Sequence, residues 1–162
     1  MSKQDVVLGI DTSCYTTSVA VLDLEGRLVA DQRKILTVAE GKCGLQQSEM
    51  VYQHTRNLPE LMAGIDFSQL NIQAVAATRQ PRPLAESYMP AFLTGWGLGQ
   101  NLAKVLNVPI YALSHQENHL LAGLWSAQGP KASRFLMLHA SGGTTDILRV
   151  EINEAQKITL TI

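Results

Sequence analysis

Short apolar runs and longer amphipathic stretches alternate along this chain. The first three runs, residues 6–10, 16–22 and 27–31, have the length of β-strands, and the second alternates apolar with polar side chains. Residues 23–26, with the sequence Asp-Leu-Glu-Gly, form a turn signal between the second run and the third. These runs predict an antiparallel meander of three strands.

The next pattern has the period of an α-helix. Four apolar residues and one histidine lie on one stripe of this helix: Met50, His54, Leu58, Leu61 and Ile65. Pro59 lies within this stretch, and because proline lacks the backbone donor that the helix needs, it predicts a kink or a division there.

Strands then alternate with helices to the end of the sequence. Residues 74–78 predict a short buried strand that the proline-rich loop 79–83 ends, and Pro90 suits the first turn of a second helix. Further strands are predicted at residues 110–113, 135–139, 146–152 and 158–162. Helices that alternate with strands after a meander indicate an α/β fold with a mixed sheet.

The composition limits the class of protein and its binding partners but does not identify a function. The chain has 162 residues, 46% of them hydrophobic and 17% charged, which suits one packed domain or one lobe of a larger protein. The net charge of −1 provides no basic field, so we expect no DNA binding, and contact with RNA would need a local patch. Cys14 and Cys43 lack metal-type spacing and are expected to be reduced thiols. Without a signal peptide or an apolar run of membrane length, the expected location is the cytoplasm.

Two histidines stand where a buried strand meets a helix. Ser114 is a good N-cap, and Glu117 three residues later completes a capping box. This places His115 in the first turn and His119 one turn further on the same face, where two imidazoles can hold a divalent metal ion. Gln116 occupies the position of the glutamate in zinc-protease helices, so that motif is absent. The alternative is a capped helix start with two polar histidines that bind nothing.

Two polar turns resemble phosphate-binding loops, and each lies at a bend between expected strands. The residues are Asp11, Thr12 and Ser13 in the first turn, and Ser141, Gly142, Gly143 and Thr144 in the second. Turn amides and hydroxyl groups of this kind can bind an anion. A Gly-Gly pair is also a common hairpin turn, so the second loop is weak evidence alone. Two other histidines, His54 and His139, lie on apolar elements, which favours packing over a metal role.

Taken in order, several segments resemble the glycoprotease family, once called O-sialoglycoprotein endopeptidase and now understood as the tRNA threonylcarbamoyladenosine synthase subunit (TsaD/Gcp). The matching segments are residues 8–14, 17–20, 44–54 with Arg56, 74–76, 102–103, 109–122, and 141–143 with Thr145. The two-histidine motif and the Ser-Gly-Gly sequence are the most specific of them. The resemblance extends over nearly the whole chain.

This resemblance implies an actin-like ATPase lobe related to the ribonuclease H fold. Residues 1–133 would form the N-terminal lobe, and 134–162 would be the first hairpin of a second lobe. It implies a zinc or iron ion on His115 and His119, and ATP or an acyl-adenylate near the loops at Asp11 and Ser141. The family transfers a threonylcarbamoyl group from its adenylate to an adenosine of tRNA, together with partner subunits. Because a second lobe would add a carboxylate ligand and the other wall of the cleft, we expect this chain alone to be inactive.

Departures from the family pattern lie mostly on the substrate side. The family usually has Glu at the position of Asp11, acidic residues at Tyr15 and Thr16, a Gly-Pro-Gly loop at residues 79–83, and His at Thr144, and its charged helix positions are Ser48 and Tyr52 here. A diverged member with a changed or lost substrate fits this pattern. The alternatives are a non-catalytic scaffold or dimer partner of an active relative, a metalloprotease, and a sugar or acid kinase of the same superfold. An isolated lobe would also expose apolar surface, which predicts self-association.

Overall fold

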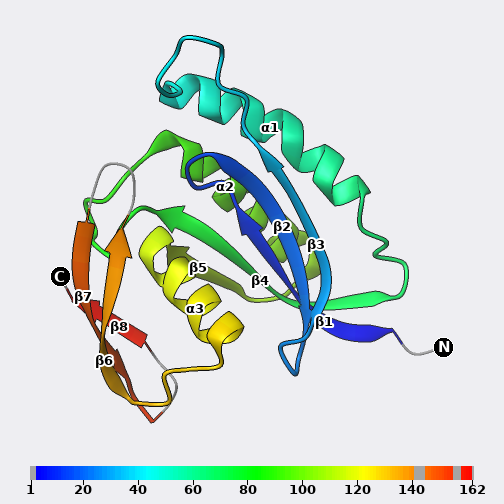
Figure 1. Ribbon diagram of the computed structural model, residues 1–162. Coiled ribbons are helices and arrows are strands. Elements are labelled where there is room, and N and C mark those ends of the chain that lie inside the picture. The colour runs from blue at the N-terminus through cyan, green and yellow to red at the C-terminus, as the bar shows by residue number, and fades with distance from the viewer. Residues whose placement is uncertain (1–2, 141–144, 155–157, 162) are drawn as a thin grey trace.

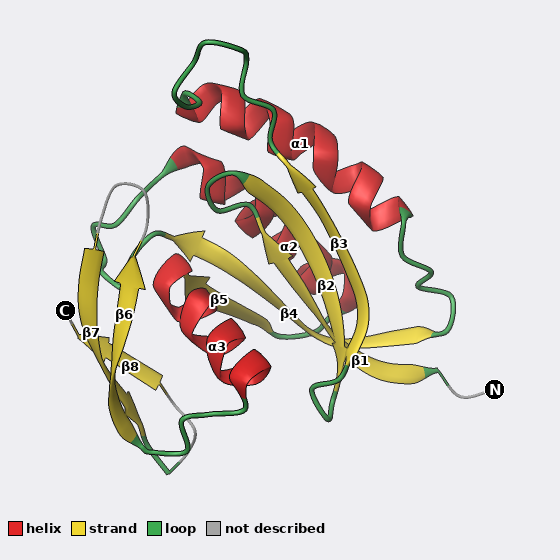
Figure 2. Cartoon of the chain, viewed as in Figure 1, coloured by secondary structure: helices red, strands yellow, loops and turns green. Residues whose placement is uncertain are grey.

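The computed structural model describes residues 3–140, 145–154 and 158–161 (Figures 1 and 2). Its elements are β1 (Gln4–Asp11), β2 (Thr16–Asp23), β3 (Leu28–Ile35), α1 (Gln47–Ala63), β4 (Leu70–Gln80), α2 (Pro90–Leu106), β5 (Ile110–Ser114), α3 (His115–Ala127), β6 (Arg134–Ala140), β7 (Thr145–Ile152) and β8 (Ile158–Thr161). The predicted α/β class is therefore confirmed.

Five strands form a central mixed sheet in the order β3-β2-β1-β4-β5. The strands β1, β2 and β3 pair antiparallel, which confirms the predicted meander, whereas β4 and β5 run parallel to β1. Val6, Leu8 and Ile10 of β1 alternate with less buried residues and pack into the main core. Because β2 is antiparallel and β4 is parallel to β1, the carboxyl end of β1 at Asp11 lies beside the start of β2 and near the carboxyl end of β4.

Helices cover both faces of this sheet. Leu58 and Leu61 of α1 and Ala103 of α2 join the main core on one face. Figure 1 shows α2 behind the sheet and α3 in front of it. The start of α3 therefore lies close to the carboxyl ends of β1, β4 and β5, on the face opposite to the main core.

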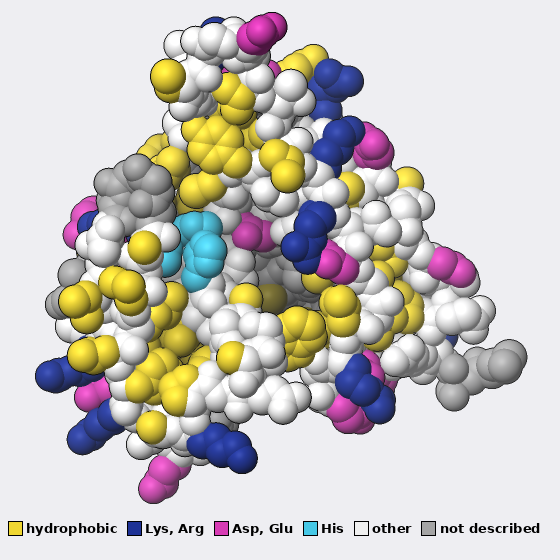
Figure 3. All heavy atoms as spheres, viewed as in Figure 1, with side chains coloured by type: hydrophobic (Ala, Val, Ile, Leu, Met, Phe, Trp, Pro, Cys, Tyr) yellow, Lys and Arg dark blue, Asp and Glu magenta, His cyan; other side chains and the backbone are white. Residues whose placement is uncertain are grey.

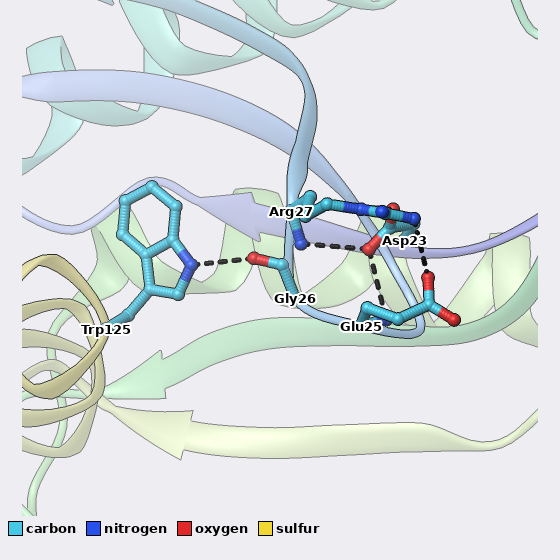
Figure 4. Close-up of polar contacts among 5 residues, drawn as sticks. All are labelled: Asp23, Glu25, Gly26, Arg27 and Trp125. Atoms are coloured by element: carbon cyan, nitrogen blue, oxygen red, sulfur yellow. Dashed lines mark hydrogen bonds and ion pairs between the residues drawn. The ribbon is translucent and has the colours of Figure 1, made fainter. Parts of the chain in front are cut away.

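The far end of α3 is tied to the β2–β3 turn. The indole nitrogen of Trp125 donates a hydrogen bond of 2.7 Å to the backbone oxygen of Gly26 (Figure 4). Within that turn, the Asp23 carboxylate accepts from the backbone and guanidinium of Arg27 and from the backbone of Glu25. Mainly through the Arg27 backbone bond, this lowers the pKa of Asp23.

The last three strands form a second, antiparallel sheet in the order β6-β7-β8. On β6 the odd-numbered positions Phe135, Met137 and His139 are more buried than the residues between them. The sheet therefore has an inward and an outward face. The assignment of residues 134–162 to a second lobe stays a prediction.

The extents of two elements differ from the expected ones. Of the kink or division expected at Pro59, the division is absent, because α1 continues to Ala63. The strand β4 does not end at Thr78, because Gln80 still pairs with Ser114 across a register shift. Among the described residues, no helix has both the length and the apolar character needed to cross a membrane.

Candidate metal centre

The capping box that the sequence predicts at the start of α3 is present. The Glu117 backbone donates to the Ser114 side chain over 3.2 Å, and the Ser114 backbone donates to the Glu117 carboxylate over 2.7 Å. These two bonds fix where the first helical turn begins. They therefore place His115 in the first turn and His119 directly above it on the same face.

The two histidine rings meet edge to face. Their Nε2 atoms are 3.0 Å apart, and their ring centroids are 4.3 Å apart. Histidine side chains reach the surface on the face drawn in Figure 3. Without an ion, one Nε2 must carry a proton for the other to accept, whereas a metal ion could accept both lone pairs.

A third histidine, His139 of β6, completes the cluster. Its ring centroid lies 6.0 Å from that of His115 and 5.2 Å from that of His119. One ligand atom from each histidine can be chosen so that all three lie within 4.8 Å of one another. Sequence reasoning favoured packing for His139 because it lies on an apolar element, and no local motif links it to a helix that starts 24 positions earlier.

Burial lowers the pKa values of the two helix histidines. The pKa of His115 falls to about 4, first through burial and then through the charges of His119 and His139, against the opposing effect of Asp11. Burial also lowers the pKa of His119, as does the charge of His139. Both rings are therefore neutral at pH 7, which is the state that binds a metal. Imidazole ligands fit zinc and iron alike, so the residues present fit the metal that the resemblance implies.

Asp11, predicted beside the nucleotide, connects β1 to this cluster. Its Oδ1 accepts from the Ser13 backbone at 2.8 Å and from the Thr78 hydroxyl at 2.6 Å. Its Oδ2 accepts from the side-chain amide of Asn118 at 2.9 Å. Because Asn118 precedes His119 on α3, this bond holds the histidine helix against the carboxyl end of β1.

Thr12 and Ser13, also predicted beside the nucleotide, are both buried, and Thr12 lies against α2. The Thr12 hydroxyl donates to the Ala91 carbonyl at 2.9 Å and accepts from the Gly95 backbone at 3.0 Å. The second predicted loop, Ser141, Gly142, Gly143 and Thr144, lies outside the described residues. Nucleotide binding by either loop stays a prediction.

His54 lies apart from the metal cluster, in the core. Its Nδ1 is 2.8 Å from the Thr17 hydroxyl, and its Nε2 is 3.1 Å from the Cys14 carbonyl oxygen. The Asn57 amide also donates to Thr17. The packing role that the sequence favoured for His54 is confirmed.

Comparison with known proteins gives a sequence relative of known activity. The chain is 34% identical over 151 residues to tRNA N6-adenosine threonylcarbamoyltransferase of Aromatoleum aromaticum. The match covers 89% of this chain but 42% of that relative, so the chain spans less than half of the relative's length. No protein-family model matches the chain.

Solved structures share the fold at lower identity. YeaZ from Pseudomonas aeruginosa superposes with a TM-score of 0.61 at 19% identity, over 97% of this chain and 64% of YeaZ. The Lmo2764 protein from Listeria monocytogenes, a proposed N-acetylmannosamine kinase, gives 0.53 at 14% identity, over 96% of this chain and 49% of that protein. At these identities the comparison concerns the fold alone.

The strand order, the helices on both faces and these structural neighbours show that the chain has the actin-like, ribonuclease H-like fold. The sequence match to the transferase adds to what the fold shows. By sequence the chain is related to tRNA N6-adenosine threonylcarbamoyltransferase, from which it has diverged to 34% identity over the matched residues.

Proposed function

We propose that this chain is the metal- and nucleotide-binding lobe of a protein that transfers a threonylcarbamoyl group to an adenosine of tRNA. The observation that supports it best is the pair His115 and His119, whose Nε2 atoms lie 3.0 Å apart at the start of a capped helix. The sequence match to a threonylcarbamoyltransferase supports the choice of reaction. The donor would be an acyl-adenylate, with ATP as the alternative nucleotide, and the setting would be cytoplasmic.

In this reaction the attacking nitrogen belongs to the tRNA base, so the chain need not provide a nucleophile. The nitrogen forms a bond to the carbonyl carbon of the threonylcarbamoyl-adenylate, and the bond from that carbon to the phosphate oxygen breaks. AMP leaves with the bonding electrons, and the nitrogen releases one proton to solvent. A zinc or iron ion, when bound, would polarise the carbonyl or hold the phosphate. The chain's own part is to orient the two imidazoles, through the capping box and the Asn118–Asp11 bond.

The chain alone should not catalyse the transfer. It spans less than half of the transferase that it matches. We expect the remaining wall of the substrate cleft, tRNA contacts and partner subunits to be needed for activity. Threonylcarbamoyl transfer to tRNA by the 162-residue chain in isolation would contradict this expectation.

Metal-dependent binding of the donor is the direct test of the proposed role. Calorimetric titration of the zinc- or iron-loaded chain with a non-hydrolysable threonylcarbamoyl-adenylate analogue should show binding. The double variant His115→Ala/His119→Ala should lose both the metal and the analogue, whereas Leu24→Ala, at the distant β2–β3 turn, should retain both. If the metal-loaded chain shows no binding of the analogue, the proposed nucleotide-binding role is refuted.

A scaffold or dimer partner of an active relative is the second candidate. Its support is that Asp11 and Thr12 already use their side-chain oxygens within the chain, where a nucleotide-binding residue would keep them available. This candidate predicts a chain that binds neither metal nor analogue but still associates with itself or with the active relative. Co-sedimentation with that relative separates the two functions.

A further inference from the structure

Within the described residues, His139 has a buried polar atom without a hydrogen-bond partner. Its side chain is 9% exposed, and its Nδ1 has no hydrogen bond within the described part of the chain. The Nδ1 of His115, its neighbour in the cluster, is in the same state. A buried nitrogen without a partner is costly, so such atoms point to a missing ligand.

The β6–β7 hairpin directs His139 toward α3. His139 pairs with Asp146 across the two strands, and directly opposed residues project from the same face of a sheet. The neighbouring pair, Leu138 and Ile147, projects from the other face and is exposed. His139 and Asp146 therefore both lie on the inward face.

Asp146 anchors this hairpin to the histidine helix. Its Oδ2 accepts from the buried side chain of Gln116 at 3.0 Å and from Arg82 at 3.2 Å. Gln116 directly follows His115, so the bond links the strand opposite His139 to the first turn of α3. The contact between His139 and the helix pair is thus held by an ionic and hydrogen-bonded clamp, Arg82–Asp146–Gln116.

We propose that His139 is a third metal ligand, so that His115, His119 and His139 form a three-histidine site within this one chain. The inference builds on the proposed metal pair, but it places the third ligand in this lobe instead of requiring a carboxylate from a second lobe. Two nitrogens on one zinc ion can be at most about 4.2 Å apart, since each bond is about 2.1 Å long. Rotation of the imidazoles brings nitrogens that lie within 4.8 Å into this range.

The ligand set indicates the class of metal. Three neutral imidazoles favour zinc, cobalt or iron over magnesium and calcium, which prefer oxygen ligands. Three protein ligands with one open position is also the arrangement of catalytic zinc sites. The chain should therefore bind one such ion tightly without any other lobe.

The test uses the 162-residue chain, with zinc and cobalt(II) as probes. Zinc affinity is measured against a competing chelator, and cobalt(II) absorption reports a four-coordinate site. The His139→Gln variant should weaken zinc binding by more than the roughly 10- to 100-fold loss that outer-shell changes cause. Asp146→Asn alters a carboxylate that bonds Gln116 and Arg82 but no histidine, so it should weaken zinc binding less. Leu138→Ala, adjacent to His139 but on the outward face, should bind as the parent does, and circular dichroism checks the fold of each variant.

Nitrogen-15 spectra of the parent's histidine rings give a readout that needs no variant. On zinc addition, the signals of His115, His119 and His139 should all move, while that of His54 should stay. Movement of the first two alone would overturn the third-ligand assignment and leave the proposed pair intact. If no histidine signal moves, both the proposed metal pair and the third-ligand assignment are wrong.

Discussion

At the scale of single residues, His54 is a titratable group enclosed in the core. It is fully buried between α1 and the β1–β2 turn, with Thr17 and the Cys14 carbonyl as partners. Burial lowers its pKa, against the smaller raising effects of the Cys14 carbonyl and the Asp11 charge. The folded protein therefore keeps His54 neutral where an unfolded chain would protonate it.

This burial makes stability fall in mild acid. Below about pH 6.5, His54 is protonated in the unfolded chain while it stays neutral in the folded chain. The free energy of unfolding therefore decreases as the pH falls. His115 and His119 act with the same sign, because their pKa values are also lowered. Urea unfolding between about pH 7 and pH 5 should show this loss, and His54→Gln should show a smaller one. An unchanged pH slope in the variant would contradict the role of His54.

The candidate site could be predicted only as far as its residues share a local signal. The capping box and the four-residue spacing lie within one short segment, so they predict the pair His115 and His119. His139 gave no such signal, because it comes from another sheet and reaches the pair through the pairing of β6 with β7. The Asp146–Gln116 bond that holds this arrangement also joins residues 30 positions apart.

At the scale of elements, α2 approaches the β1–β2 turn closely at one glycine. A methyl group added at Gly95 would lie 2.8 Å from the Thr12 hydroxyl oxygen and 3.2 Å from a methyl carbon of Ile10. Gly97, two positions further along the helix, has nothing within 4 Å of such an added group. The two glycines of one helix thus differ in surroundings and form a matched pair.

We expect the alanine variants of these glycines to shift stability in opposite directions. Gly95→Ala should lower the free energy of unfolding by about 1–3 kcal/mol, because Thr12 is already held by Ala91 and cannot move aside freely. Gly97→Ala should raise it by up to about 1 kcal/mol, since alanine favours the helix. Chemical denaturation of both variants measures the difference, and equal effects would show that the close approach does not constrain α2.

The capping box of α3 offers a second test on an element. Ser114→Ala removes the side-chain acceptor for the Glu117 backbone and should cost about 1 kcal/mol of unfolding free energy. Ser126→Ala, near the exposed end of the same helix, should change it by less than about 0.5 kcal/mol. If Ser114→Ala binds zinc more weakly and Ser126→Ala does not, the cap helps to position the histidine pair. If the two variants are equally stable, the capping box does not stabilise α3.

The sequence predicted correctly which segments are helices and which are strands, but it predicted their first and last residues less well. Pro59 was expected to kink or divide α1, and the helix is not divided: its buried residues Met50, His54, Leu58 and Leu61 lie on both sides of Pro59. Packing of these residues outweighs the lost backbone bond. The strand β4 extends to Gln80 because β5 provides a parallel partner, which a local sequence signal does not reveal.

At the scale of the whole molecule, the second sheet leaves one face uncovered. Leu136, Leu138 and Ile147 on its outward side are 71%, 67% and 63% exposed. Leu138 and Ile147 face each other across the strands, so the three side chains form one apolar surface. Hydrophobic side chains are visible over this hairpin at the left of Figure 3.

We expect this surface to make the chain self-associate, as the sequence predicts for an isolated lobe. Burying contiguous apolar area removes it from water, at roughly 25 cal/mol per Å², so copies of the chain should pair as concentration rises. Leu138→Lys places a charge at the centre of the surface and should shift sedimentation equilibrium toward the monomer. Leu24→Lys, which is comparably exposed at the β2–β3 turn, should leave association unchanged. A parent chain that stays monomeric at every concentration, or two variants that behave alike, would show that this face does not mediate contact between copies.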